Sequence, residues 1–146
     1  MFILVGGVLY DRFHTRVIRY YRGVTVYMPV FSALFFVTTA FNMAVPLSLN
    51  WIGEFMSLAG TFQRSPIVGL LGASSIILSA AYSIYLYNRI SYGAYSRYLS
   101  YTTDISRREF MLMLPLLLVA VIFGIMPNII LADLHVAVSG LLYTAA

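Results

Sequence analysis

Residues 24–62 decide the fold and read VTVYMPVFSALFFVTTAFNMAVPLSLNWIGEFMSLAGTF. The stretch is almost wholly apolar, but Pro46 and residues 47–50 interrupt it. As one straight helix, Tyr27–Phe62 would be roughly 54 Å long, whereas the hydrocarbon core of a bilayer is about 30 Å thick. The part after the interruption is too short to cross on its own. Because proline removes a backbone donor and clashes with the preceding turn, we predict one discontinuous helix with an unwound middle.

The composition of the chain indicates lipid as its solvent. Hydrophobic residues make up 61% of the 146 residues and charged residues only 10%, whereas a soluble domain is nearer half apolar and about a quarter charged. We therefore predict an all-α fold of polytopic transmembrane helices, one of them broken by proline. The absence of Cys excludes disulfides, Cys-based metal sites and Cys nucleophiles. The net charge of +4 does not predict nucleic-acid binding, because no basic run stands free of the apolar segments.

The chain divides into apolar and polar segments that together form a single membrane unit. We predict the end of a span at 1–10, a basic loop at 11–23, the broken helix at 24–62, a span at 66–88, a basic loop at 89–107, a span at 108–127 and a tail at 128–146. Ser106 and Glu109 have the spacing of a capping box that would start the last span. The first segment is either a frayed terminus or the last turns of a span that begins in another polypeptide.

The distribution of Arg supports this division. When the broken helix counts as one crossing, both basic loops lie on the same side of the membrane, and Arg64 alone lies on the other. The positive-inside rule then places the basic loops in the cytoplasm or the mitochondrial matrix. That side carries the other eight Arg, at positions 12, 16, 19, 22, 89, 97, 107 and 108. Five Tyr in or beside the second loop are typical of the headgroup region; they are Tyr87, Tyr92, Tyr95, Tyr98 and Tyr101.

Glu54 is the one charged residue inside an apolar stretch. A carboxylate is costly in lipid, so such a group usually faces a protein interior or water, or is protonated. Because burial disfavours the charged form and a nearby cation favours it, a carboxyl group held in this way can change its protonation state near neutral pH. That property is what a proton-carrying site requires. The alternative is a structural acid that pairs with an Arg or forms a hydrogen bond across helices.

Polar residues at helical spacing surround Glu54 in three stripes. On the helix of Glu54 itself, the residues on the same face are Asn50, Ser57 and Thr61. The preceding half-helix carries Ser32, Thr39 and Asn42, and the following span carries Ser75, Ser79 and Tyr82. We take five of these as candidate proton relays: Asn50, Ser57, Thr61, Asn42 and Tyr82. Ser and Thr stripes also join membrane helices without any transport role.

Sites for other chemistry are not predicted from this sequence. His14 lies in the first basic loop and His135 in the tail, and each is better explained as a surface or interfacial side chain than as a ligand. Neither a Gly-rich phosphate loop nor a His-x-x-x-His spacing occurs. We therefore expect no metal site and no cofactor in this chain.

The segment Asn42–Phe55, NMAVPLSLNWIGEF, resembles the broken helix of chain 4 in respiratory NADH:ubiquinone oxidoreductase (complex I), from the antiporter-like subunit family. Leu9–Arg16 looks like the matrix loop before that helix. Ala81–Arg89 and Arg107–Phe110 resemble the end of its next span and the start of its last one. The likeness covers nearly the whole chain and keeps its order.

The resemblance implies a proton-translocating subunit of the membrane arm, of which this chain would be the C-terminal portion. It places Glu54 at the acid that belongs to the central proton axis. The chain would serve the H⁺-translocating NADH:ubiquinone reductase without any redox chemistry of its own, since NADH, FMN, iron–sulfur clusters and ubiquinone would be bound by other subunits. The expected location is the mitochondrial inner membrane with the basic loops on the matrix side, or alternatively a bacterial plasma membrane.

This sequence departs from the family in length and in its lack of Lys. A family member is much longer and uses a further glutamate and two lysines, which this chain lacks. We therefore expect it to dock with other membrane-arm subunits, among them a chain that carries the N-terminal spans. Either it is the product of a split gene, as its Met1 start suggests, or it is a fragment. Two other readings stay open, a subunit of a multisubunit cation/proton antiporter and a purely structural element of the arm.

Overall fold

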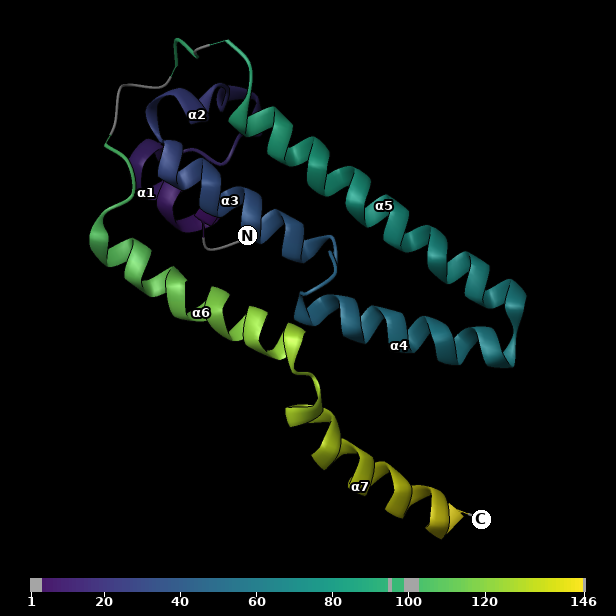
Figure 1. Cartoon of the computed structure of the whole chain (residues 1–146). Coiled ribbons are helices and arrows are strands. Elements are labelled where there is room, and N and C mark those ends of the chain that lie inside the picture. The colour runs from purple at the N-terminus through teal and green to yellow at the C-terminus, as the bar shows by residue number, and fades with distance from the viewer. Residues whose placement is uncertain (1–3, 95, 99–102, 146) are drawn as a thin grey trace.

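The computed structural model describes residues 4–94, 96–98 and 103–145, and over these it is all-helical, as predicted (Figure 1). The parts of the predicted segments that lie outside the described residues are 1–3, Tyr95, 99–102 and Ala146. The elements in order are a π-helical turn at Leu4–Leu9, α1 at Tyr10–Phe13, a 3-10 turn at Ile18–Tyr20, α2 at Val24–Tyr27, α3 at Pro29–Asn42, α4 at Leu49–Arg64, α5 at Pro66–Ser91, α6 at Arg107–Ile125 and α7 at Asn128–Ala145.

The predicted interruption of the apolar stretch lies between α3 and α4, at residues 43–48, which we call the break. Within it, Ala44 and Leu47 adopt left-handed backbone conformations, with φ of 55° and 79°. Such conformations are rare for residues with a side chain and persist only where the surrounding structure holds them. Ser48 then caps α4, because its Oγ accepts a hydrogen bond from the Trp51 N–H at 3.3 Å.

The first half of the broken helix begins later than its apolar pattern suggests. A short helix, α2, ends at Tyr27, Met28 leaves the helical conformation, and α3 begins at Pro29. The residue before a proline is disfavoured in the helical region, which accounts for the interruption at Met28. The carboxylate of Asp104 then accepts the N–H groups of Val30 at 2.8 Å and Phe31 at 3.1 Å. The cap of α3 therefore comes from a loop more than 70 residues away in the sequence.

The helices pack around the broken pair α3–α4. The long helix α5 follows α4 after a single residue and runs back along both α4 and α3 (Figure 1). Helix α6 packs against α4, and α7 extends away from the rest of the molecule (Figure 1). Pro66 occupies the start of α5, and Ser106 with Glu109 forms the predicted capping box of α6. A second proline, Pro115, lies inside α6.

The hydrophobic core lies at the end of the molecule that carries the basic loops, which we call the basic end. Its largest fully buried side chains include Phe31 and Phe35 of α3 and Ile90 of α5. The Tyr21 hydroxyl donates a hydrogen bond of 2.6 Å to the Thr15 carbonyl oxygen. Burial raises the pKa of Tyr21, so the phenol stays protonated and keeps this bond.

The two basic loops lie together at the basic end, as the distribution of Arg predicted. The N–H of Gly23 donates a hydrogen bond to the carbonyl oxygen of Tyr92 at 3.3 Å. Arg12 forms an ion pair with Glu109 at 3.0 Å and also donates to the carbonyl oxygen of Asp104 at 3.0 Å. These contacts fix the start of α6 and the N-terminal segment to one another.

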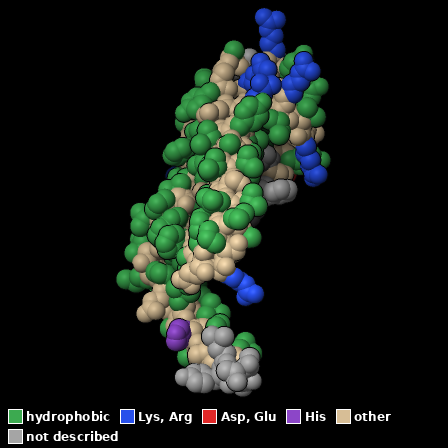
Figure 2. All heavy atoms as spheres, turned by 90° about the vertical axis from the view of Figure 1, so that its right-hand side faces the viewer, with side chains coloured by type: hydrophobic (Ala, Val, Ile, Leu, Met, Phe, Trp, Pro, Cys, Tyr) green, Lys and Arg blue, Asp and Glu red, His purple; other side chains and the backbone are tan. Residues whose placement is uncertain are grey.

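Most of the apolar surface is left uncovered by this chain. Its accessible surface is 10189 Å², against about 7,500 Å² for a compact monomer of this size. Two helices, α5 and α6, are long and apolar enough to cross a membrane by length and composition, and only 11% and 6% of their most apolar windows are buried inside the chain. Figure 2 shows hydrophobic side chains over most of one face, with the basic side chains gathered mainly at the upper end. Lipid or other protein must therefore cover these helices.

Candidate functional site

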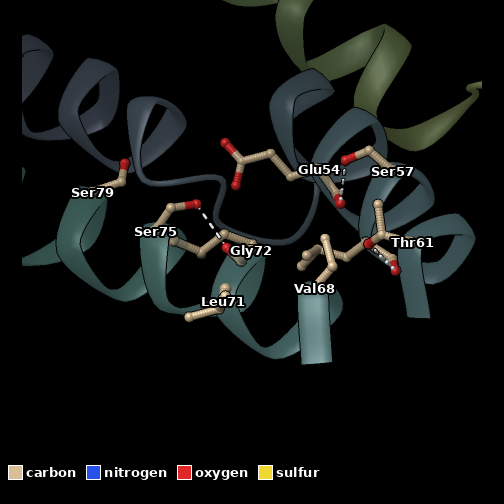
Figure 3. Close-up of a pocket in the computed structure, with 10 residues that line it drawn as sticks. Glu54, Ser57, Thr61, Val68, Leu71, Gly72, Ser75 and Ser79 are labelled. Carbon is tan, nitrogen blue, oxygen red and sulfur yellow. Dashed lines mark hydrogen bonds between the residues drawn. The ribbon is translucent and has the colours of Figure 1, made fainter. Parts of the chain in front are cut away.

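Glu54 lies in the sixth position of α4 and faces a pocket between α4 and α5, which we call the Glu54 pocket. This cavity has a volume of about 450 Å³. Figure 3 shows the carboxyl group of Glu54 extending toward the side of the pocket that carries Ser75 and Ser79. The lining from α4 is Glu54, Ser57, Leu58 and Thr61, and that from α5 is Val68, Leu71, Gly72, Ser75, Ile76 and Ser79. The lining therefore combines apolar side chains with hydroxyl groups from both helices.

One carboxyl oxygen of Glu54, Oε2, is shielded from solvent and has no hydrogen-bond partner among the described residues. All nine Arg lie in the part of the chain that the structure describes, and the ion pair found there joins Arg12 to Glu109. Glu54 is therefore not paired with an Arg of this chain. A buried polar atom without a partner costs about 1–3 kcal/mol, and more when it is charged. A proton, a bridging water or a cation from a neighbouring chain would each relieve that cost.

Three of the four hydroxyl groups that line the pocket donate hydrogen bonds to backbone carbonyl groups of their own helices. Ser57 donates to the carbonyl oxygen of Glu54 at 2.9 Å, Thr61 to that of Leu58 at 2.8 Å, and Ser75 to that of Gly72 at 2.7 Å (Figure 3). Each of these hydroxyl groups already donates its proton to a hydrogen bond. Its oxygen can therefore only accept a further hydrogen bond. A protonated Glu54 can donate to such acceptors, directly or through water, whereas a carboxylate gains nothing from them. The lining therefore offers acceptors to a donor or to an intervening water.

A second polar cluster lies where α3 ends beside α5. The amide nitrogen of Asn42 donates to the hydroxyl oxygens of Tyr82 at 3.2 Å and Ser83 at 3.0 Å. The Tyr82 hydroxyl also interacts with Ser79, which lines the Glu54 pocket. Ser79 therefore belongs to both groups, and the polar side chains continue from Glu54 to the last residue of α3.

Three other residues of the predicted stripes lie elsewhere. Asn50 is outside the Glu54 pocket, because its amide nitrogen donates to the carbonyl oxygen of Phe41 at 3.2 Å across the break. Helix ends leave such carbonyl groups without an intrahelical partner, and Asn50 satisfies this one. Ser32 and Thr39 are both buried residues of α3. Ser32 lies beside α5 and contacts Thr25 at 3.0 Å. Thr39 donates to a backbone carbonyl oxygen of its own helix.

The structure also brings residues to the site that sequence reasoning missed. Gly124 of α6 passes so close to the break that a Cβ there would overlap the carbonyl oxygen of Leu47. Ser83 receives the Asn42 amide and is fully buried. A glycine within an apolar helix and a serine on a long span are both ordinary in sequence. Only the folded structure shows that Gly124 contacts the break and that Ser83 accepts the Asn42 amide.

The described residues contain no group of three His, Cys, Asp or Glu side chains that could hold a metal ion. His14 has a left-handed backbone with φ of 50° at the end of α1, and its ring contacts that of Tyr10 edge to face at 6.0 Å. His135 is exposed on α7.

Comparison with known proteins shows long relatives of this chain. It is 68% identical over all of its 146 residues to NADH-ubiquinone oxidoreductase chain 4 of Mycosarcoma maydis, of which it covers 30%. It is 49% identical over 123 residues, 84% of its length, to NADH-ubiquinone oxidoreductase chain 4 of Metridium senile, of which it covers 25%. The chain therefore spans less than a third of the length of these curated relatives.

A solved structure shows the same arrangement of helices. A chain of the structure titled respiratory complex I from Thermus thermophilus with bound NADH superimposes with a TM-score of 0.76 at 27% identity, over 85% of this chain and 26% of that one. Residues 1–79, more than half of the chain, match the family described as NADH:quinone oxidoreductase/Mrp antiporter, TM. The chain therefore belongs to the NADH:quinone oxidoreductase/Mrp antiporter transmembrane family.

Proposed function

We propose that this chain forms the C-terminal portion of chain 4, a proton-translocating subunit in the membrane arm of NADH:ubiquinone oxidoreductase, and that Glu54 carries the proton. The observation that supports this most is the shielded Glu54 oxygen without a partner, in a pocket whose hydroxyl groups offer acceptors. A structural acid would be paired or fully hydrogen-bonded, because an unpaired buried carboxyl group destabilises the fold. A group that alternates between two protonation states needs the opposite, an environment that satisfies neither state completely.

The polar side chains suggest a route on either side of Glu54. Ser57 and Thr61 line the pocket along α4 and would hold bridging water. Toward the break, Ser79 leads to the hydroxyl of Tyr82 and the amide of Asn42. A hydroxyl can accept one proton while it donates another, so Tyr82 suits a relay, whereas Asn42 holds it in place. Asn50 would act on the geometry of the break instead, through its bond to the carbonyl oxygen of Phe41.

The proposed setting follows from the relatives and from the uncovered surface. The chain would lie in the mitochondrial inner membrane with the basic end in the matrix. Its exposed apolar helices would contact lipid, other membrane-arm subunits and a chain that carries the N-terminal spans. NADH, FMN, iron–sulfur clusters and ubiquinone would be bound by other subunits, whose redox reactions drive the protonation changes.

The replacement Glu54→Gln tests the proton-carrying role, because it keeps the shape of the side chain and removes its titration. The matched control is Asp133→Asn, which removes an exposed carboxylate on α7 far along the chain from the pocket. Both variants are assembled into the complete complex in closed membrane vesicles. Protons moved per NADH oxidised are measured by dye quenching, together with the amount of assembled complex. We expect Glu54→Gln to assemble normally and to pump fewer protons per NADH, while Asp133→Asn pumps as the parent does.

Undiminished pumping by Glu54→Gln would refute the proposal and leave a scaffold as the role of this chain. A second candidate, a cation/proton antiporter subunit, is favoured by the family match itself, since that family includes the Mrp antiporters. The two are separated by cation dependence. Sodium- or potassium-coupled proton movement in vesicles without NADH supports antiport, whereas pumping that requires NADH and no such cation supports the redox-driven complex.

A further inference from the structure

The basic end holds a second pocket, which the proposed function does not use and which we call the basic pocket. Its volume is about 530 Å³, and it opens between the two basic loops. The side chains that matter for its chemistry are Arg19, Tyr20 and Arg22 from the first loop and Ser96, Arg97 and Tyr98 from the second. It lies at the end of the molecule where Figure 2 shows basic side chains gathered. Three Arg residues therefore line one cavity.

Among the described residues, none of these three Arg forms an ion pair. All five acids lie in the described residues, and the ion pair found among those residues joins Arg12 to Glu109. Asp104, the acid in the second loop, accepts hydrogen bonds from the backbone N–H groups of α3. Neighbouring cations repel one another, so an arrangement of this kind is stabilised when an anion enters it. The pocket is therefore short of negative charge.

The two loops that border the basic pocket contact one another. The two loops are joined by the Gly23–Tyr92 backbone bond, and the Thr25 hydroxyl donates to the carbonyl oxygen of Ser91 at 2.8 Å. The rings of Tyr20 and Tyr98 lie against one another with centroids 5.1 Å apart, one from each loop. Ser96 is only 8% exposed. Because the walls are already joined, binding costs less conformational entropy than it would between two free loops.

We propose that the basic pocket binds a phosphate group, and that an anionic phospholipid headgroup supplies it. Guanidinium groups match the oxygens of a phosphate in charge and in geometry, and bind them in pairs. The pocket follows directly on the end of α5, among tyrosines, which is the depth at which headgroups lie. A soluble phosphate offers the same chemistry from the aqueous side. This inference does not depend on the role of Glu54.

The test uses the full chain in phosphatidylcholine vesicles that contain phosphatidylglycerol with a photoreactive headgroup. Crosslinks are mapped by mass spectrometry in the parent chain, in the triple variant R19Q/R22Q/R97Q and in the control R89Q/R107Q/R108Q. The control removes three charges from the same side of the membrane without touching the pocket. We expect crosslinks at residues 19–22 and 96–98 in the parent. They should fall at least about tenfold in the pocket variant and far less in the control, since each basic residue near the surface attracts anionic lipid. R19K/R22K/R97K, which keeps the charges, should recover part of the signal.

Excess inorganic phosphate distinguishes the two sources. If phosphate leaves the crosslinks unchanged, the lipid headgroup is the ligand. If phosphate abolishes them, and labelled phosphate binds the parent but not R19Q/R22Q/R97Q in pure phosphatidylcholine, the pocket serves a soluble phosphate. Equal losses in both triple variants, with circular dichroism showing the parent's helix content in each, would mean general surface attraction and would overturn the proposal. So would crosslinks that avoid both loops.

Discussion

The basic end and the α4–α5 hairpin differ in how they satisfy their buried or half-buried carboxylates. At the basic end, Asp104 caps α3 and Glu109 pairs with Arg12, next to the hydrophobic core. In the hairpin, α4 has no buried residue, and Glu54 presents a shielded oxygen without a partner among the described residues. An unsatisfied buried polar atom costs about 1–3 kcal/mol. The chain therefore satisfies Asp104 and Glu109 at the basic end by itself, where the buried Ser91 hydroxyl has no partner among the described residues, and leaves Glu54 to be completed by a proton, by water or by a neighbour.

The basic end holds the fold together, and the α4–α5 hairpin carries the candidate site. The basic end orients α3 and α6, and through them it positions the break that precedes α4, the helix of Glu54. The hairpin contributes little buried surface, so changes in its polar side chains are tolerated by the fold.

The largest effect on stability is expected where the two ends meet, at the contact of Gly124 with the break. In Gly124→Ala, the new Cβ would overlap the carbonyl oxygen of Leu47, and backbone cannot move aside as a flexible side chain can. We expect the free energy of unfolding to fall by about 3 kcal/mol, at the upper end of overpacking effects. Unfolding of the full chain in mild detergent, followed by circular dichroism during titration with dodecyl sulfate, measures it.

The matched control is Gly60→Ala in α4, where an added Cβ meets open space. Because Ala is the better helix former, this variant should be more stable by up to about 1 kcal/mol. If the two variants unfold alike, α6 does not approach the break as described, and the two ends are not connected through Gly124.

Local chemistry made part of this fold predictable from the sequence. Pro46 marks the break, Pro66 begins α5, and Ser106 with Glu109 starts α6, because each acts on residues within one turn. The separate start of α3 at Pro29 was not predicted. Its cap is supplied by Asp104 across more than 70 residues, a distance over which spacing carries no information.

The candidate site shows the same limit. Helical spacing predicted that Ser57, Thr61 and Asn50 share one face of the helix with Glu54. Ser57 and Thr61 line the Glu54 pocket, and Asn50 does not. Asn50 sits in the first turn of α4, where the unpaired carbonyl oxygen of Phe41 across the break offers it a better partner. The periodicity of a helix predicts faces well in its interior and poorly beside an interruption. Gly124 gave no signal at all, since its role depends on which backbone passes beside it.

The next largest effect on stability is expected at the cap of α3, in the basic end. Asp104→Ala removes the acceptors of the Val30 and Phe31 N–H groups and leaves both without partners. Helix caps contribute about 0.5–2 kcal/mol and bonds to charged groups somewhat more, so we expect a loss of about 2 kcal/mol in the same titration. The exposed acid Asp133 provides the comparison, and Asp133→Ala should change stability by less than about 0.5 kcal/mol. Equal effects would mean that the cap of α3 contributes nothing.

The smallest effect on the free energy of unfolding is expected in the Glu54 pocket. The Ser57 hydroxyl donates within its own helix to the carbonyl oxygen of Glu54, which already belongs to the helical ladder. Ser57→Ala should therefore shift the free energy of unfolding by less than about 0.5 kcal/mol, with a slight gain because Ala is the better helix former. A loss above about 1 kcal/mol would show that Ser57 bonds something else in the membrane. The hairpin would then be held together by the same groups that are proposed to serve proton transfer, and the division between the two ends would fail.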